Sequence, residues 1–456
     1  MSFPLRAVLA DEGDIEVVAA KAESQFPDGI RFSITAKSSE EIDDIRIFFR
    51  KIGQSSRSAY RTMDFQPGTL IIGESMLSSG GGNAYFPPGT RILYSFEIRD
   101  KGGAVLRTPE QDFVYSDQRF EWLEVTSGLI TVDYYGEYVE QRAKTVLQAA
   151  EDAMERMIPV LNIEPTEPLR IVAYNNYRHM SAALPFRSQA VTEQLQTQGM
   201  AFTDERVLLV HAFDPTVKGT VSHEFTHLLI TEAAGRASSQ VPAWLSEGLA
   251  EYGNIDPTDS YDAALRYGIY TRRLRPLWYQ DSFGGTPDDI IIAYGQGRSV
   301  VNFMIVKYGI KKMTDLFPAL QSTLDIDLAL QQVYGLDQFG LDTEWRLSLG
   351  IEPLPSPEEL EQRLRGEEPT ELEAETEAAS ETEPEATSAP EPSPTATPAA
   401  TPSASLEDEG LRPSSPGGCS SPARAGGAAP MGMGSLLLLG APLALLSFQS
   451  WRRRRS

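Results

Sequence analysis

The chain has 456 residues, a formal net charge of −24 and 41% hydrophobic residues. This length predicts two or three domains, and the apolar fraction is sufficient for a true core. The excess of acidic residues argues against nucleic acid as a partner, because binding to phosphates needs a basic surface. The lone cysteine, Cys419, excludes intrachain disulfides and a thiolate metal site in the folded part of the chain.

Residues 1–118 are predicted to form a β-sandwich domain. Apolar and polar residues alternate over 30–36 and again over 92–98, which is the period of half-buried strands. The segment 100–103 supplies a hairpin turn after the second of these strands. Several short strands with turns between them predict an immunoglobulin-like sandwich. Because this region carries no recognisable chemistry, we expect a packing or substrate-presenting module.

Residues 125–350 are predicted to form a second, mostly helical domain with a small sheet. Apolar residues recur at helical spacing over 137–157, and a short apolar strand follows at 169–174. A short helix is expected at 176–183 and another strand at 207–210. The chain as a whole is therefore assigned to the α+β class.

The stretch His223-Glu224-Phe225-Thr226-His227 holds two of the four histidines of the chain. Histidines four residues apart lie on one face of a helix, so both imidazoles can reach one metal ion. Gly235 is expected to end this helix. Zinc accepts such nitrogens readily. Glu224 is then placed to take a proton from metal-bound water. The alternative interpretation is a solvated polar turn on an ordinary helix.

A third protein ligand, which a catalytic zinc typically has, is available from Glu247. Glu247 follows the second histidine by twenty positions (247 − 227), which leaves room for a helix, a loop and the start of another helix. Glu251 shares its helical face and could accept the free N–H of a ligating histidine. The alternative for both glutamates is a solvated helix start, which Pro242 would also favour.

Together these two motifs resemble those of the gluzincin metallopeptidases, the group that includes thermolysin and the M1 aminopeptidases. The string Trp-Leu-x-Glu-Gly-x-Ala-x-Tyr at 244–252 is similar to the third-ligand segment of that group. The resemblance implies that His223, His227 and Glu247 bind one zinc ion per chain. It also implies that Glu224 is the catalytic base and that Glu251 orients a histidine ligand.

The resemblance extends to three further features of the domain. It implies an edge strand that holds extended substrate, and the strand at 207–213 is our candidate. It also implies a tyrosine that stabilises the oxyanion, for which Tyr294 is our candidate, with a tyrosine stacked in the helical core as the alternative. The remaining histidines, His179 and His211, are expected at the surface or in packing, because the three ligands are already assigned.

A basic cluster is made by Arg272, Arg273 and Arg275 at the end of a helix predicted over 261–275. Such a cluster could bind a substrate carboxylate or simply complement the helix dipole. We favour the second interpretation.

The expected function is hydrolysis of peptide bonds in a peptide or protein substrate by a zinc metallopeptidase. Endopeptidase activity is slightly favoured over aminopeptidase activity, because the chain lacks the Gly-x-Met-Glu-Asn segment that M1 enzymes use to grip a free amine. One rival is a cell-surface binding or adhesion protein whose peptidase-like domain is inactive or secondary. Another is hydrolysis of a non-peptide amide.

The C-terminal part of the chain changes composition sharply. Residues 355–430 are acidic and then rich in Pro, Thr and Ser, which predicts a disordered linker. Residues 431–451 form an apolar stretch long enough to span a bilayer. The basic residues at 452–456 predict a cytoplasmic tail, so the folded domains are expected outside the cytoplasm of a single-pass cell-membrane protein.

The order of Cys419, apolar span and arginine cluster resembles bacterial C-terminal sorting tails. That resemblance implies a sorting protease or transferase that acts near Cys419. An outward-facing protein also needs an export signal, and the first eleven residues are too short and too mixed for one. We therefore expect an apolar leader encoded upstream of Met1.

Overall fold

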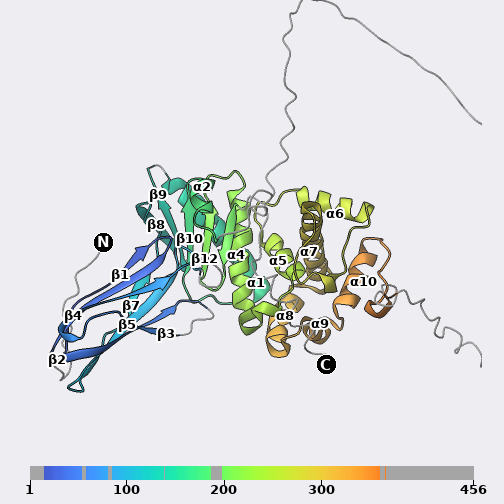
Figure 1. The fold of residues 1–456 in the computed structure, drawn as a ribbon. Coiled ribbons are helices and arrows are strands. Elements are labelled where there is room, and N and C mark those ends of the chain that lie inside the picture. Colours follow the sequence, from blue (N-terminus) through green and yellow to red (C-terminus); the bar gives the residue numbers. More distant parts are fainter. Residues whose placement is uncertain are drawn as a thin grey trace, which may run out of the picture. The chain divides into compact units, whose positions relative to one another are not determined.

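The computed structural model describes residues 15–53, 58–80, 85–137, 139–185, 198–359 and 365. Within these residues a sheet-rich N-terminal region precedes a mainly helical region, which confirms the predicted α+β class (Figure 1). None of the described helices combines the length and the apolar character that a bilayer span needs. The predicted span, the basic tail and Cys419 lie outside the described residues, as does nearly all of the predicted linker.

The N-terminal region is one seven-stranded sheet built around a single long strand, β2. Its strands are β1 (Glu16–Gln25), β2 (Gly29–Lys51), β3 (Ala59–Thr62), β4 (Gly68–Ser78), β5 (Arg91–Asp100), β6 (Val105–Arg107) and β7 (Gln111–Val114). The first half of β2 pairs with β1 and β4, and its second half pairs with β3 and β5. Register irregularities between Lys37 and Asp44 separate the two halves.

The alternation predicted for this region is observed. Ile30, Phe32 and Ile34 of β2 are each at most 1% exposed, and they share a core with Ile92 and Phe96 of β5. Apolar residues at every second position point to one face of a strand, so both halves of β2 contribute to the same core. The immunoglobulin-like class stays a prediction.

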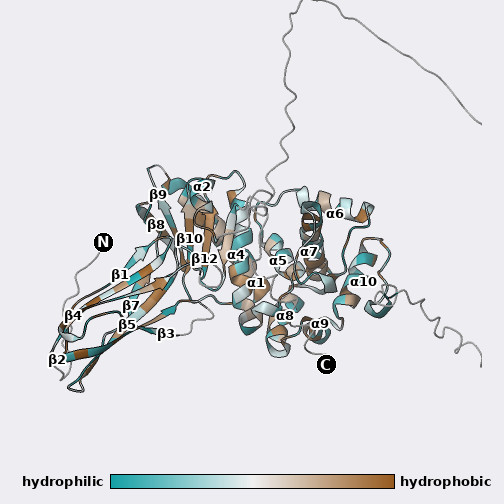
Figure 2. Cartoon of the chain, in the orientation of Figure 1, coloured by the Kyte–Doolittle hydropathy of each residue, from teal (hydrophilic) through white to brown (hydrophobic). Residues whose placement is uncertain are grey.

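A second sheet of five strands is formed by segments between Trp122 and His211. Its order is β11 (Gly199–Phe202), β12 (Val207–His211), β10 (Leu169–Tyr174), β9 (Ile130–Tyr135) and β8 (Trp122–Ser127). The three central strands are parallel to one another, and the two outer strands are antiparallel to their neighbours. Strands β10 and β12 are strongly apolar, as buried parallel strands are (Figure 2).

The prediction of an edge strand at 207–213 is wrong. Strand β12 pairs with β10 on one side and with β11 on the other, so it lies inside the sheet. The last strand in the order at this end is β11, whose four residues include a glycine and an alanine. Such a segment is too short, and too poor in β-branched residues, to stand out in a sequence.

The helical region follows the second sheet along the chain, apart from two helices between its strands. Its helices are α1 (Glu140–Leu161), α2 (Tyr177–Ser181), α4 (Val217–Ala234), η2 (Gly235–Gln240), α5 (Ala243–Gly253), α6 (Ser260–Tyr270), η3 (Leu277–Tyr279), α7 (Pro287–Tyr308), α8 (Ile310–Thr323), α9 (Ile326–Tyr334) and α10 (Gln338–Ser348). Helix α4 packs on α1, α5, β11 and β12 and is buried along most of its length. A helix buried on nearly every side belongs to the core of a domain, so any polar group on it needs a partner.

Candidate metal centre

The two histidines of the predicted motif come from the middle of α4. His223 is 3% exposed, and the side chain of His227 is 14% exposed. They are one helical turn apart, and their ring centroids are 5.0 Å from each other. The helix runs past them until Gly235, whose positive φ of 52° ends it, as the sequence predicts.

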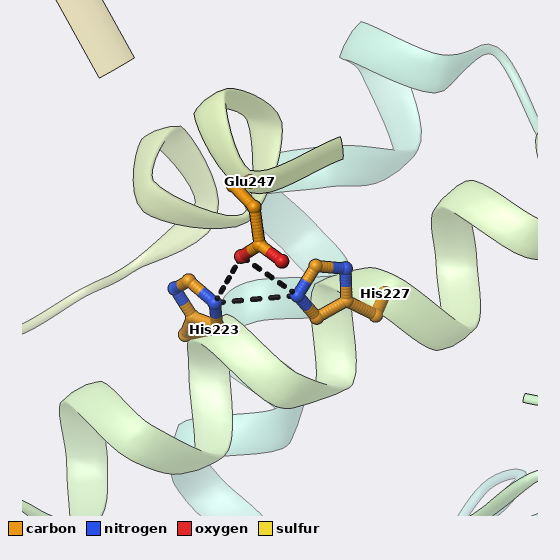
Figure 3. Close-up of side chains that lie close together, drawn as sticks. All are labelled: His223, His227 and Glu247. Carbon is orange, nitrogen blue, oxygen red and sulfur yellow. Dashed lines mark hydrogen bonds and ion pairs between the residues drawn. The ribbon is translucent and has the colours of Figure 1, made fainter. Parts of the chain in front are cut away.

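The predicted third ligand comes from α5, which begins directly after Pro242. A close approach between α5 and α7 sets the position of this helix. A Cβ atom at Gly248 would lie only 2.4 Å from the carbonyl oxygen of Gly297 on α7. Because neither residue has a side chain there, the backbones of α5 and α7 are in contact. The Glu247 side chain points toward His223 and His227 of α4 (Figure 3).

Three atoms of these residues form an almost equilateral triangle (Figure 3). The Nε2 atoms of His223 and His227 are 3.3 Å apart, and Oε2 of Glu247 lies 3.2 Å from the first and 3.3 Å from the second. Tetrahedral zinc with bonds of about 2.0 to 2.1 Å has ligand atoms about 3.3 to 3.4 Å apart. The group therefore fits one face of a zinc tetrahedron and could hold a metal ion.

The other nitrogen of each imidazole has its own partner. Nδ1 of His223 lies 2.6 Å from Oε1 of Glu251, and Nδ1 of His227 lies 3.1 Å from the hydroxyl oxygen of Ser246. A carboxylate only accepts, so Nδ1 of His223 carries a proton, and Nε2 is the nitrogen that a metal ion would bind. Two imidazole nitrogens that face each other at 3.3 Å need a shared proton or a cation between them.

Buried charges produce strong electrostatic effects at this triangle. Burial lowers the pKa of His223, but its hydrogen bonds to Glu247 and Glu251 outweigh burial and raise that pKa to about 10. Burial raises the pKa of Glu247, whereas the imidazoles beside it hold that pKa at about 2. Both shifts come from the mutual attraction of the imidazoles and the carboxylates in a buried setting.

Glu224 lies on α4 beside the triangle and is 2% exposed. Its Oε2 accepts a hydrogen bond of 3.0 Å from the backbone N–H of Ala201 on β11. Its Oε1 is buried and has no hydrogen-bond partner among the described residues. Burial raises the pKa of this carboxyl, and the imidazoles of His227 and His223 oppose the rise. The backbone contact thus fixes one oxygen and leaves the other available to a polar molecule.

Two stacked tyrosines form part of the wall of the site. Tyr294 of α7 is 1% exposed, and its ring centroid is 6.2 Å from that of His223. Tyr261 of α6 stacks on Tyr294 at 5.5 Å, and Phe283 contacts it edge-on at 5.3 Å. Burial and then the charge of Glu247 raise the pKa of Tyr294 well above its usual value, so its phenol keeps its proton. Tyr294 is therefore both packed in the helical core and close to the predicted ligands.

The remaining histidines lie apart from this group. Nδ1 of His179 is 2.7 Å from the Tyr135 hydroxyl, and Nδ1 of His211 is 3.0 Å from Oε1 of Gln198. Neither belongs to the metal-ligating group found among the described residues. Both rings are hydrogen-bonded to neighbouring side chains, which fits the expected role in packing.

The interpretation of the basic cluster is wrong for Arg273. Helix α6 ends at Tyr270, so Arg273 lies beyond it. The Arg273 side chain forms ion pairs with Asp288 and Asp289 in the first turn of α7, and Asp289 also forms a capping box with Thr286. Arg273 therefore forms ion pairs with the first turn of α7 and does not complement the dipole of α6.

Sequence reasoning missed two parts of the site. The N–H of Ala201 left no signal, because any residue but proline supplies one. Tyr261 is 33 positions before Tyr294 (294 − 261), and only the packing of α6 on α7 brings the two together.

Comparisons with known proteins point to the same region of the chain. Residues 149–350 match the family model described as the Peptidase MA superfamily. This range contains the ligand triangle, Glu224, Glu251 and both tyrosines of the wall. No curated protein matches the chain.

Two solved structures are similar to parts of the chain. Yeast LTA4 hydrolase in complex with bestatin is 11% identical, over 75% of this chain and 69% of that one, with a TM-score of 0.34. A bromine derivative of BhCBM56 is 12% identical, over 23% of this chain and 96% of that one, with a TM-score of 0.16. Both TM-scores are too low to define a shared fold.

Proposed function

Because residues 149–350 form a gluzincin-like peptidase domain, we propose that this protein is a zinc metallopeptidase that hydrolyses peptide bonds. The observation that carries the proposal is the triangle of His223 Nε2, His227 Nε2 and Glu247 Oε2, with its edges of 3.2 to 3.3 Å. Two imidazoles and one carboxylate leave a fourth tetrahedral position open, as catalytic zinc sites do. When bound there, zinc would polarise the scissile carbonyl and acidify water.

In the proposed mechanism Glu224 moves the proton. Its Oε1 has no partner among the described residues, so this oxygen accepts a proton from the attacking water. The N–H of Ala201 holds Oε2 and keeps the carboxylate directed at the site. The same carboxyl then delivers the proton to the leaving amine. Burial favours the protonated form that exists between these two steps.

Three other features have proposed supporting roles. Glu251 orients the His223 ring through Nδ1, at 2.6 Å. The Tyr294 phenol keeps its proton and donates a hydrogen bond to the oxyanion that forms on the carbonyl oxygen. Strand β11, last in the sheet order, aligns an extended substrate by strand addition. We retain endopeptidase activity as slightly favoured over aminopeptidase activity.

We also propose that the enzyme is anchored to the cell membrane with its folded domains outside the cytoplasm. Support comes from the sequence alone: the apolar residues 431–451, the arginines after them and the long linker before them. A sorting enzyme that acts near Cys419 belongs to the same proposal. Fractionation of cells that express the full gene would test it, since recovery in the soluble cytoplasmic fraction would contradict the anchor.

The test of the peptidase proposal separates metal binding from chemistry. The full chain and its Glu224→Gln, Glu247→Ala and Arg266→Gln variants are purified without added metal and analysed by elemental mass spectrometry. We expect about one zinc per chain, retained in Glu224→Gln and reduced in Glu247→Ala. Hydrolysis of a mixed peptide library should fall by at least about a hundredfold in Glu224→Gln and stay unchanged in Arg266→Gln, because Arg266 is exposed. Hydrolysis that survives in Glu224→Gln, or a chain that binds no zinc, would refute the proposal.

A further inference from the structure

Helix α7 carries, one turn after Tyr294, a cation that the proposed mechanism leaves without a role. Arg298 follows Tyr294 by four residues on α7, so the two side chains are neighbours on one face of the helix. The side chain of Arg298 is 19% exposed. Its Nη1 is buried and has no hydrogen-bond partner among the described residues.

The nearest acidic group does not satisfy this guanidinium. Nη1 lies 3.4 Å from Oδ1 of Asp262 on α6, without the geometry of a hydrogen bond. Asp262 is 52% exposed, so water screens its charge. A buried N–H group that is left without an acceptor is costly, and folded proteins rarely keep one for structural reasons alone.

The position of Arg298 relates it to the metal centre. The Tyr294 ring is 6.2 Å from His223 and 5.5 Å from Tyr261. Nη1 of Arg298 pairs with Asp262, the residue after Tyr261 on α6, so the guanidinium lies beside the contact between Tyr261 and Tyr294. One helical turn is about 5.4 Å, so Arg298 lies about one turn along α7 from the residue that faces His223.

The negative charge of the metal centre gives a nearby cation an effect on which substrates can bind. Three buried carboxylates, those of Glu224, Glu247 and Glu251, belong to the centre. They would repel an anionic part of a substrate unless a cation faced it. A guanidinium presents five N–H donors in a planar fork, and this fork matches a carboxylate.

We propose that Arg298 binds a carboxylate of the peptide substrate and so determines which peptides this site prefers. A peptide carries this group either as its C-terminal carboxylate or as an Asp or Glu side chain near the scissile bond. The inference rests on the proposed peptidase function, because it takes the substrate to be a peptide bound at the metal centre. Arg298 is a specificity residue here and takes no part in bond cleavage.

The test measures binding in a protein that does not turn the probe over. Glu224→Gln in the zinc-loaded full chain is the background, and calorimetry gives the Kd of three probes. These are acetyl-Ala-Ala-Ala-Phe with a free carboxylate, its C-terminal amide, and the amide acetyl-Ala-Glu-Ala-Phe-amide. Each is titrated into the background and into that background carrying Arg298→Gln, Arg298→Lys, Asp262→Asn or Arg266→Gln. Arg266 is an exposed arginine on α6 and serves as the matched control.

We expect at least one carboxylate probe to bind roughly ten- to a hundredfold more tightly than the neutral amide. Arg298→Gln should abolish that ratio and leave the affinity for the neutral amide unchanged. Arg298→Lys should keep part of the ratio, because the charge remains without the fork. Preference for the free acid assigns the C-terminal carboxylate, and preference for the glutamate probe assigns a side chain.

Two results would overturn the inference. One is a ratio that survives in Arg298→Gln. The other is an equal loss of thermal stability in Arg298→Gln and Asp262→Asn with no change in the ratio of the affinities for the carboxylate and amide probes. That result would mean that the ion pair only stabilises the packing of α6 on α7. Hydrolysis of the amide by the unmutated chain is recorded separately. If it is absent while the ratio depends on Arg298, the peptidase proposal fails and the carboxylate site stands.

Discussion

The contact between Glu251 and His223 allows a quantitative prediction about metal affinity. Oε1 of Glu251 lies 2.6 Å from Nδ1 of His223, and the two side chains are only 1% and 4% exposed. A hydrogen bond with an ionised acceptor is about twice as strong as a neutral one. It fixes the ring orientation and raises the basicity of Nε2, the atom that faces the other ligands. Glu251→Gln removes the charge and keeps the size of the side chain.

We expect zinc affinity to fall about ten- to a hundredfold in Glu251→Gln, which is the range seen when a partner of a ligating histidine is changed. This corresponds to about 1.4 to 2.7 kcal/mol of binding free energy. The amide oxygen of glutamine still accepts the N–H of His223, so the metal-free fold should keep its free energy of unfolding within about 1 kcal/mol. The measurement is a competition titration with a chromophoric chelator at neutral pH, with urea unfolding of the metal-free protein beside it.

The surroundings of Glu251 supply a matched control. Nδ2 of Asn254 lies 3.5 Å from the other carboxylate oxygen, at the limit of a hydrogen bond. Asn254→Ala removes that neutral contact and should alter zinc affinity much less than Glu251→Gln does. If both variants bind zinc as tightly as the parent, the carboxylate does not tune this ligand. If metal-free Glu251→Gln is already unfolded, its role is structural. Either result would refute the reasoning.

Three further predictions concern the wall, the helix packing and the metal itself. Tyr294→Phe should lower kcat by about a hundred- to a thousandfold at unchanged zinc content, because one oxyanion donor is lost. Steady-state kinetics and a zinc assay measure the two quantities. If Tyr294 has a purely structural role, the variant should instead lose zinc or melt at a lower temperature. Gly248→Ala should destabilise the protein by about 1 to 3 kcal/mol, because its Cβ would meet a carbonyl oxygen at 2.4 Å. Gly284→Ala is the control and should not destabilise it, because nothing lies within 4 Å of the new atom. Equal midpoints of urea unfolding for the two variants would contradict the packing argument. Zinc at a thousand times its Kd should add about 4 kcal/mol to the free energy of unfolding, and thermal melts should show this gain vanishing in Glu247→Ala.

The sequence predicted the helix of the motif and the position of both histidines well, because spacing alone defines one face of a helix. It also predicted Gly235 as the helix end and the alternating strands of the N-terminal region. It failed for β11, whose four residues carry no pattern of their own. That strand becomes regular only by pairing with β12, and such a tertiary effect cannot be read from local propensity.

The helices after the motif also differ in how well the local sequence predicts them. The start of α7 has a sequence signal of its own, because Thr286 forms a capping box with Asp289 and Pro287 suits the first turn of a helix. Helix α8 (Ile310–Thr323) was not predicted, and the proline inside it explains why, because proline usually ends a helical pattern. Pro318 is nevertheless accommodated within the helix, whose buried face packs on α9 and α1.

The geometry of the candidate site depends on features that motifs do not contain. Spacing brings His223 and His227 together, but Glu247 reaches them from another helix, α5, whose backbone packs closely on α7 at Gly248 and Gly297. The result is a buried cluster with more carboxylates than imidazoles. Burying unpaired charge is costly, and hydrophobic packing around α4 cannot compensate for it locally. A divalent cation between the ligand atoms would remove most of that cost. We therefore expect the metal to stabilise the packing of α4 on α5 in addition to its role in catalysis. Oε1 of Glu224, which has no hydrogen-bond partner among the described residues, is then a position where the fold leaves a hydrogen bond to be completed by water or substrate. Nη1 of Arg298, which has an ion pair with Asp262 but no hydrogen bond, offers a second such position.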